Sequence, residues 1–254
     1  MTSALSFGGG VNSTAMLLHM IEQGTPPDLV MFADTGGEKP ETYEHVMGMV
    51  LWCKTRGIQF ERVSNGSEAK GQTLEQNCLK RKELPSLAYG FKGCSVKWKR
   101  QPMDRYIRDW QPAIEAWARG ELVDRFIGID AGEPNRAKLP PDEKFRYRYP
   151  LVDAGIDRDG CIEIIKRHGL EVPPKSSCFF CPAMRRSEIL DLREKHPDLL
   201  ARALAIESNA ATHTVEGLGR NWSWSGFLHA DERQGKLFHD MTEQPCGCHD
   251  GDDE

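Results

Sequence analysis

Two cysteines separated by two residues, Cys178 and Cys181, are the clearest candidates for chemistry in this sequence. The chain holds eight cysteines in total. Its first residues lack the basic and then apolar profile of a secretory signal peptide, so we expect a cytoplasmic protein. Cysteines in such a protein serve metal, cluster or redox chemistry more often than disulfides. The C-x-x-C pair therefore indicates a redox dithiol, a zinc site or an iron–sulfur site.

The residues around this pair favour a metal or a cluster over a redox dithiol. A thioredoxin-like dithiol opens a helix directly after a strand, whereas the proline-rich stretch 173–177 predicts a loop before Cys178. Zinc or an iron–sulfur cluster needs three or four thiolate ligands. Further ligands must then come from elsewhere in the chain.

A second candidate for chemistry is the run Gly8-Gly9-Gly10, which is followed by the hydroxyl side chains of Ser13 and Thr14. Glycines let the backbone approach a phosphate closely, and a helix that begins after them presents N–H groups to an anion. The run matches neither the P-loop pattern nor the dinucleotide-binding fingerprint. On its own it predicts either a phosphate site or a tight turn without a ligand.

The elements that would position these residues alternate between strand and helix. Apolar runs at 4–7, 28–33 and 58–63 predict strands, and segments 11–21 and 41–51 have the spacing of helices packed on a sheet. This alternation predicts an α/β fold with a doubly wound parallel sheet. A further strand is expected at 123–130, and helices at 160–168, 187–195 and 197–208.

These patterns divide the chain into three parts. We expect a nucleotide-binding α/β domain at 1–155, a cysteine-containing and mainly helical region at 156–226, and a polar, acidic tail at 227–254. Much of the net charge of −5 comes from the tail, so the body of the chain is near neutral and nucleic acid stays open as a partner. No apolar run approaches the roughly 18 residues that span a bilayer, so we expect no membrane partner.

The glycine run and two further motifs resemble the PP-loop ATP pyrophosphatase and phosphoadenylylsulfate (PAPS) reductase superfamily. Residues 6–13 are similar to its S-x-S-G-G-x-D-S loop, and residues 32–36 and 40–42 to the DTG and PET stretch after its second strand. The resemblance implies an adenine nucleotide α-hydrolase-like fold that binds ATP with Mg²⁺. The residues that it places at the nucleotide are Ser6, Phe7, Gly8, Gly9, Gly10, Asn12, Ser13, Thr14, Asp34 and Thr35.

The loop departs from the family pattern at three positions. Gly8 replaces the first loop serine, Val11 a residue that is often basic, and Asn12 the usual aspartate. Magnesium prefers anionic oxygen ligands, so the loss of that aspartate leaves Asp34 or Glu38 to hold the ion. The alternative for Asp34 is a strand-end residue that caps the following turn.

Further motifs resemble a branch of the superfamily that phages and mobile elements often carry. They are C-[ST]-x-x-x-K at 94–99, I-G-I at 127–129 with Glu133 and Arg136, Y-P-L at 149–151 with Arg158 and Cys161, and P-x-K-S-x-C-x-x-C-P at 173–182. Relatives in the wider group include DNA phosphorothioation and tRNA thiolation enzymes that bind a [4Fe–4S] cluster through cysteines. The resemblance therefore implies a cluster on Cys94, Cys161, Cys178 and Cys181, with zinc as the competing metal.

The other cysteines have simpler interpretations. Cys53 lies on an amphipathic helix and is expected to be packed, and Cys78 is interpreted as a plain thiol, with a spare ligand as the alternative. Cys246 and Cys248 partly resemble the mobile E-C-G-x-H segment of PAPS reductases, whose cysteine attacks sulfur. A disordered acidic tail also explains these residues and is the interpretation that we favour.

The resemblance implies an enzyme that adenylates a substrate with ATP, releases pyrophosphate and transfers sulfur from a donor to a nucleic acid, either DNA or tRNA. Basic and aromatic side chains alternate through 97–110, which indicates a nucleic-acid contact or a solvated helix face. The alternatives are a sulfonucleotide reductase that uses a tail cysteine, and a binding module that no longer cleaves ATP. The oligomeric state stays unassigned. The predicted catalytic residues are Ser13, Asp34, Glu133 and Arg136.

Overall fold

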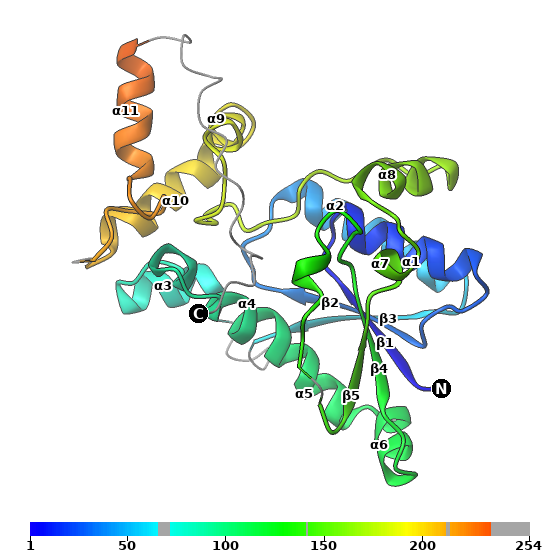
Figure 1. Ribbon diagram of the computed structural model, residues 1–254. Helices are drawn as coiled ribbons and strands as arrows, with labels where there is room; N and C mark the ends of the chain where they lie inside the picture. Colours follow the sequence, from blue (N-terminus) through cyan, green and yellow to red (C-terminus); the bar gives the residue numbers. More distant parts are fainter. Residues whose placement is uncertain (66–71, 141, 212–213, 235–254) are drawn as a thin grey trace.

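Five parallel strands form the centre of the molecule in the computed structural model, which describes residues 1–65, 72–140, 142–211 and 214–234 (Figure 1). The order across the sheet is β3-β2-β1-β4-β5, and every neighbouring pair is parallel. The predicted α/β fold with a doubly wound parallel sheet is confirmed. The strands are β1 (Ser3–Phe7), β2 (Leu29–Asp34), β3 (Gln59–Ser64), β4 (Val123–Ile127) and β5 (Phe145–Arg148).

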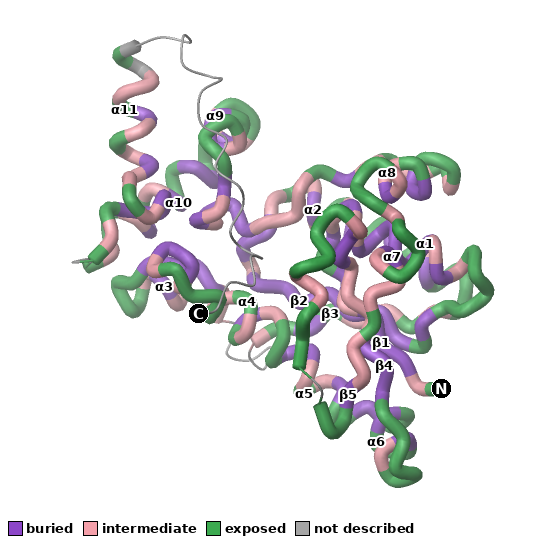
Figure 2. The backbone as a smooth tube through the Cα atoms, viewed as in Figure 1, coloured by how far each residue is buried: buried purple, intermediate pink, exposed green. Residues whose placement is uncertain are grey.

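Helices cover both faces of this sheet, because alternate side chains of each strand point to opposite sides. Leu5 and Phe7 of β1 join the apolar core on one face, and Ala4 joins the core on the other. Strand β2 is buried along its whole length (Figure 2). The first face is covered by α1 (Val11–Glu22), α2 (Pro40–Lys54), α7 (Pro150–Asp153) and α8 (Arg158–Arg167), and the second by α5 (Gln101–Asp109) and α6 (Gln111–Ala118).

A third apolar core lies in a helical lobe beside the sheet. Phe179, Phe180 and Trp224 are its largest fully buried side chains. The lobe combines segments from both halves of the chain. They are α3 (Leu74–Arg81), the short helix η2 (Ser86–Tyr89), α4 (Gly93–Ser95), the π-helix η3 (Val96–Arg100), α9 (Arg186–Lys195), α10 (Pro197–Asn209) and α11 (Trp224–Gln234).

The domain boundaries expected from the sequence need two adjustments. The helical lobe includes residues 74–100, which the sequence assigned to the α/β domain, whereas α8, assigned to the helical region, packs on the sheet against α1. Helix α11 crosses residue 227, where the tail was expected to begin, because Trp224 and Leu228 are buried in the lobe. The rest of the tail, with Cys246 and Cys248, lies outside the described residues.

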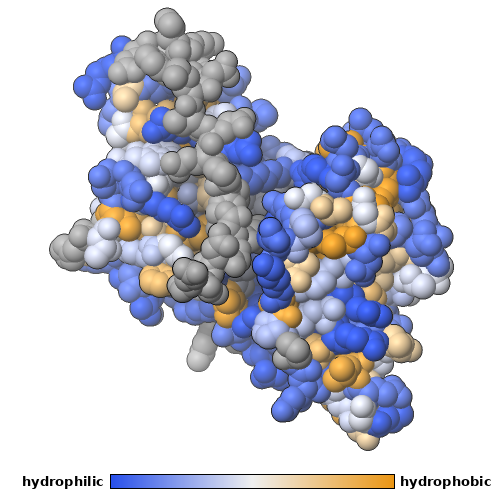
Figure 3. Space-filling model, viewed as in Figure 1, coloured by the Kyte–Doolittle hydropathy of each residue, from blue (hydrophilic) through white to orange (hydrophobic). Residues whose placement is uncertain are grey.

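Exposed apolar side chains are few and scattered. The face drawn in Figure 3 is mainly hydrophilic over both the sheet domain and the lobe, with apolar residues in small separate groups. None of the helices in the described part of the chain is both long and apolar enough to pass through a bilayer.

Candidate functional site

The glycine run lies where the chain direction across the sheet reverses, between β1 and β4. Ligands of open parallel sheets bind in this crevice, at the carboxyl ends of the strands. Gly8–Gly10 connect β1 to α1, and Gly128 follows β4 directly. A Cβ atom on Gly128 would lie 3.0 Å from both the backbone nitrogen and the Cα of Ser13, so β4 approaches the first turn of α1 too closely for a side chain.

Hydrogen bonds within the glycine turn hold the start of α1. The Gly8 N–H donates to the Ser13 hydroxyl at 3.1 Å, and that hydroxyl donates to the Gly10 carbonyl, also at 3.1 Å. Gly9 has a φ of 73°, which disfavours any side chain. Helix α1 has no side-chain cap and no acidic residue in its first turn. Its first backbone N–H groups are therefore oriented to receive an anion.

The turn is supported from below by side chains of the sheet core. The Thr14 hydroxyl donates to the Gly10 carbonyl at 2.9 Å and lies 2.9 Å from Nε2 of His45. Because Thr14 gives its only proton to the carbonyl, Nε2 of His45 must donate to Thr14. Burial lowers the pKa of His45, so the ring is neutral near pH 7. Thr14 and Phe7 are fully buried, so the side chains of these two predicted binding residues shape the turn from beneath.

Asn12 is held between two charged side chains. Its Nδ2 donates to Oδ2 of Asp130 at 2.8 Å, and its Oδ1 accepts from Nη1 of Arg158 at 2.9 Å. Asp130 follows β4 and is only 5% exposed, and its Oδ1 accepts the N–H of Gly132 at 2.9 Å. The amide that replaces the usual loop carboxylate is thus fixed in one orientation, with a carboxylate beside it.

Asp34, predicted to bind the nucleotide or magnesium, is already saturated at the end of β2. Its Oδ2 pairs with Nε and Nη2 of Arg62, the former at 2.8 Å. Its Oδ1 accepts from Tyr43 and from the Gly36 N–H, both at 2.8 Å. Burial, with the Asp34 hydrogen bond, raises the pKa of Tyr43, which therefore stays a hydrogen-bond donor. In this arrangement Asp34 fixes the loop after β2.

Glu38 and Lys99 form an ion pair between the sheet domain and the lobe. The two atoms are 3.1 Å apart, and the Glu38 side chain is completely buried while that of Lys99 is 36% exposed. The Glu38 charge raises the pKa of Lys99, so the ammonium form is maintained. The second oxygen of Glu38 has no hydrogen-bond partner among the described residues.

The C-x-x-C segment lies directly against this loop and the glycine turn. Sγ of Cys178 is 3.1 Å from the Thr35 hydroxyl and 4.0 Å from the paired oxygen of Glu38. The Phe179 N–H donates to the Gly37 carbonyl at 2.7 Å. A Cβ atom on Gly10 would lie 2.7 Å from the Ser176 hydroxyl. The predicted nucleotide loop and the predicted thiol site are therefore neighbours, although about 170 residues separate them.

The predicted ligand cysteines do not all gather in one place. Cys94, Cys178 and Cys181 belong to the core of the helical lobe, together with Cys78. Cys161 is fully buried in the other core, between α8 and α1, where it packs with Ile164 and Ile165. Within the described ranges, no three His, Cys, Asp or Glu side chains are close enough to hold a metal ion. The predicted set with Cys161 therefore does not fit a cluster, and Cys78 is the fourth thiol of the lobe.

Burial controls the state of these thiols. It raises the pKa of Cys78 and of Cys161 to about 12 each, and for Cys78 the neighbouring Cys94 adds to the effect. Burial and the Glu38 carboxylate raise the pKa of Cys178, which Lys99 partly opposes. Without a bound cation all three are thiols at neutral pH.

We expect the change Cys161→Ala to leave the metal content of the protein unchanged. Cys161 lies in the sheet core, away from the thiols of the lobe. Iron and zinc counted per chain after anaerobic purification should equal the wild-type values within error. The comparison is Cys178→Ala, which removes a buried cysteine from the lobe instead of the sheet core. A loss of metal in Cys161→Ala alone would contradict this assignment.

The remaining predicted site residues flank the turn. Nη2 of the buried Arg125 donates to the Ser6 hydroxyl at 3.2 Å, which directs Ser6 toward the α5 face of the sheet. Glu133 and Arg136 pair with each other after β4. Nε of Arg136 is buried without a hydrogen-bond partner among the described residues, so it retains a donor.

Sequence reasoning missed Asp130 and His45 and left Ser176 and Lys99 without a role. Asp130 ends the apolar run 123–130, and a carboxylate at the end of a strand next to β1 was a usable signal. The contact of Ser176 with the glycine turn depends on how the lobe packs, which no local pattern reports.

Two comparisons with known proteins found similarities. Residues 2–121 match the family model described as the phosphoadenosine phosphosulfate reductase domain. Among solved structures, the chain is similar to the U34-tRNA thiolase NcsA from Methanococcus maripaludis with its [4Fe–4S] cluster. That similarity has a TM-score of 0.47 and 16% identity, and covers 98% of this chain and 80% of that chain. No curated protein matches the sequence.

Proposed function

We propose that the chain, whose residues 2–121 match the model of the phosphoadenosine phosphosulfate reductase domain, is an enzyme that adenylates a substrate with ATP. A substrate oxygen attacks the α-phosphorus, the bond from that phosphorus to the bridging oxygen breaks, and pyrophosphate leaves. The residues proposed to meet the phosphates are the amides of the glycine turn, with Ser13 and Arg136. Catalysis then comes mainly from positioning and charge stabilisation.

The observation that carries this proposal is the geometry of the turn between β1 and α1. The turn lies at the point where the strand order reverses, and α1 begins after it without a side-chain cap, so the first N–H groups of the helix are left for an anion. Ser13 and Thr14 fix the carbonyl of Gly10, which orients the following amides. A preorganised set of amides is the kind of site that binds a polyphosphate without reorganisation.

The test is exchange of labelled pyrophosphate into ATP, measured with total tRNA or single-stranded DNA as acceptor. Exchange that requires one of these acceptors would support adenylation. Tight ATP binding with neither exchange nor pyrophosphate release would identify a binding module instead. Reduction of PAPS by the full chain, lost when the chain ends at Leu237, would favour the sulfonucleotide reductase.

We extend the proposal to transfer of sulfur at the same site, with a hydrosulfide equivalent from a separate donor. Its sulfur attacks the carbon that bears the adenylate, the carbon–oxygen bond breaks, and AMP leaves as the S–H proton goes to solvent. The support is the contact of the C-x-x-C segment with the turn through Ser176 and Cys178. Because the predicted cluster ligands do not fit one site, no step is assigned to a cluster.

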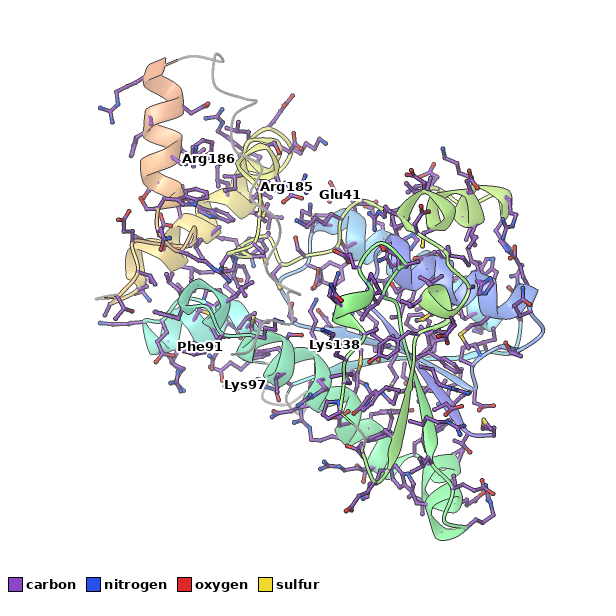
Figure 4. All side chains as sticks on the ribbon, in the orientation of Figure 1. Glu41, Phe91, Lys97, Lys138, Arg185 and Arg186 are labelled. Carbon is purple, nitrogen blue, oxygen red and sulfur yellow. The ribbon has the colours of Figure 1, made fainter. Side chains whose placement is uncertain are left out.

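A nucleic acid is the acceptor that we propose, on the basis of the surface around the junction of the two lobes. Figure 4 shows Lys97, Lys138, Arg185 and Arg186 around this junction, with the ring of Phe91 nearby. Phe91 is 68% exposed. In the described part of the chain, Lys97 and Lys138 have no ion pair, while Oε1 of Glu41 on the same side lies 2.7 Å from Nε2 of His196. Unpaired lysines beside an exposed ring suit phosphates and a stacked base.

The double change Lys97→Ala and Lys138→Ala should weaken binding of single-stranded nucleic acid and lower its dependence on salt. Each lost phosphate contact reduces the slope of log affinity against log salt by about 1, so we expect a reduction of about 2. Fluorescence anisotropy with a labelled oligonucleotide, recorded at salt concentrations from about 50 to 200 mM, measures the affinity and this slope. RNA and DNA oligonucleotides are compared in parallel.

The matched control is Lys54→Ala, an equally exposed lysine at the far end of α2. It should leave the slope unchanged. An unchanged slope in the double variant would remove the support for this surface as the acceptor site.

A further inference from the structure

A buried carboxylate without a cationic partner lies beside the glycine turn. Asp130 is 5% exposed, yet within the described ranges it forms no ion pair. Its hydrogen bonds come from the neutral amides of Asn12 and Gly132, one to each oxygen. The guanidinium of Arg158 donates to Oδ1 of Asn12 and not to Asp130. Burial of a carboxylate without a cationic partner has a free-energy cost, because the charge is removed from water.

The other candidate carboxylates at this edge of the sheet each have a cation already. Asp34 pairs with Arg62, Glu38 with Lys99, and Glu133 with Arg136. The two residues that the sequence left to hold magnesium therefore both have a charge that is paired, although the second oxygen of Glu38 has no hydrogen-bond partner among the described residues. Asp130 is the carboxylate whose charge remains available, and each of its oxygens keeps a lone pair after its single hydrogen bond.

We propose that Asp130 is the protein ligand of the divalent cation that accompanies the nucleoside triphosphate, and that the hydrogen bond from Asn12 orients the Asp130 carboxylate. This inference rests on the proposed function, because the cation arrives with the triphosphate. Divalent magnesium is bound in such sites through one or two carboxylates together with substrate phosphates, and it supplies charge neutralisation there. Asp130 has the required chemistry and is tied to the first turn of α1 through Asn12.

The hydrogen bond between Asn12 and Asp130 provides a reciprocal test. The exchange Asn12→Asp and Asp130→Asn moves the carboxylate across the same hydrogen bond, and Arg158→Gln added to it leaves the relocated carboxylate without a cation, as Asp130 is in the wild type. If the requirement is one carboxylate at this position, the exchanged pair should work where Asp130→Asn alone fails. A role confined to folding would not predict a gain of cation-dependent binding.

The experiment measures the dissociation constant of ATP by calorimetry, with Mg²⁺ and with EDTA, and follows Mn²⁺ binding in the presence of ATP by electron paramagnetic resonance. For the wild type we expect Mg²⁺ to tighten ATP binding by about tenfold or more. The ratio of the ATP dissociation constant in EDTA to that in Mg²⁺ measures this effect. For Asp130→Asn the ratio should fall to within about twofold of one, while the dissociation constant in EDTA stays near the wild-type value. The exchanged variant that also carries Arg158→Gln should recover most of the effect of Mg²⁺ on ATP binding and most of the bound Mn²⁺.

The control is Asp157→Asn, which removes a neighbouring exposed charge but keeps a residue able to cap α8. It should retain the wild-type ratio. A wild-type ratio in Asp130→Asn would overturn the inference and leave ATP binding intact. If Asp130→Asn does not fold, an exchanged variant that binds ATP without any effect of Mg²⁺ would overturn it equally. Absence of ATP binding by the wild type under both conditions would instead overturn the proposed function.

Discussion

The change Gly9→Ala should lower the rate of ATP–pyrophosphate exchange at least about tenfold. Gly9 has a φ of 73°, and a left-handed backbone costs a residue with a Cβ roughly 1–2 kcal/mol. Its Cβ would also lie 3.0 Å from Cγ2 of Thr42 and 3.1 Å from Cγ2 of Val46, so α2 would have to move. A relief of this strain by rotation of the turn would misdirect the amides that are proposed to bind phosphate.

A matched control separates the backbone penalty from the effect on the turn. Gly24 has a φ of 68° at the other end of α1, and no atom lies within 4 Å of the position that a Cβ on it would take. Gly24→Ala should therefore show a similar loss of stability in urea unfolding and wild-type exchange. Equal exchange rates in the two variants would show that the conformation of the glycine turn does not govern the reaction.

The sheet and its first two connections could be predicted from the sequence because their signals are local. The apolar run of β2 and the spacing of Val46 and Val50 in α2 each specify one element and the face that it buries. The glycine run then had to lie at the carboxyl end of β1, because parallel strands carry their connections there. The location of the nucleotide site follows from these local patterns.

The edge strand and the helical lobe could not be predicted because their stabilising contacts are distant in sequence. Strand β5 is four residues long and reads Phe-Arg-Tyr-Arg, too short and too polar to stand out, and its pairing with β4 makes it a strand. The lobe joins residues 74–100 to residues 178–228 through one core. No periodicity within either segment reports that they pack together.

The sequence held a pattern that predicts a buried Cys161, but the family resemblance assigned Cys161 to the cluster instead. Cys161, Ile164 and Ile165 have i, i+3, i+4 spacing, which is typical of the buried stripe of a helix. That stripe packs on α1 in the sheet core. Motif order placed Cys161 among the ligands, whereas its helix placed it in the core. Cys78 is the reverse case: it is interpreted as a plain thiol from the sequence, but the structure places it in the lobe with the other thiols. The sequence did not show this because the residues that pack around Cys78 in the lobe include segments that are distant in the chain.

The change Lys99→Met should destabilise the protein by about 3 kcal/mol. Glu38 is completely buried, and removal of its cation leaves a buried charge without compensation, which typically costs about 3–5 kcal/mol. The lower end of that range applies because Lys99 is itself 36% exposed and partly screened by water. Urea unfolding at pH 7 measures the loss.

Two further variants identify the cause of this loss. Lys175 is 37% exposed and pairs with Glu188 at 3.0 Å, but Glu188 is 21% exposed, so Lys175→Met should cost only about 1 kcal/mol or less. The double change Glu38→Gln and Lys99→Met removes both charges and should recover most of the stability lost in Lys99→Met. If the double variant is as unstable as Lys99→Met at pH 7, the loss comes from the packing of the lysine stem. The Glu38 and Lys99 pair would then join the lobe to the sheet through apolar contact rather than through charge.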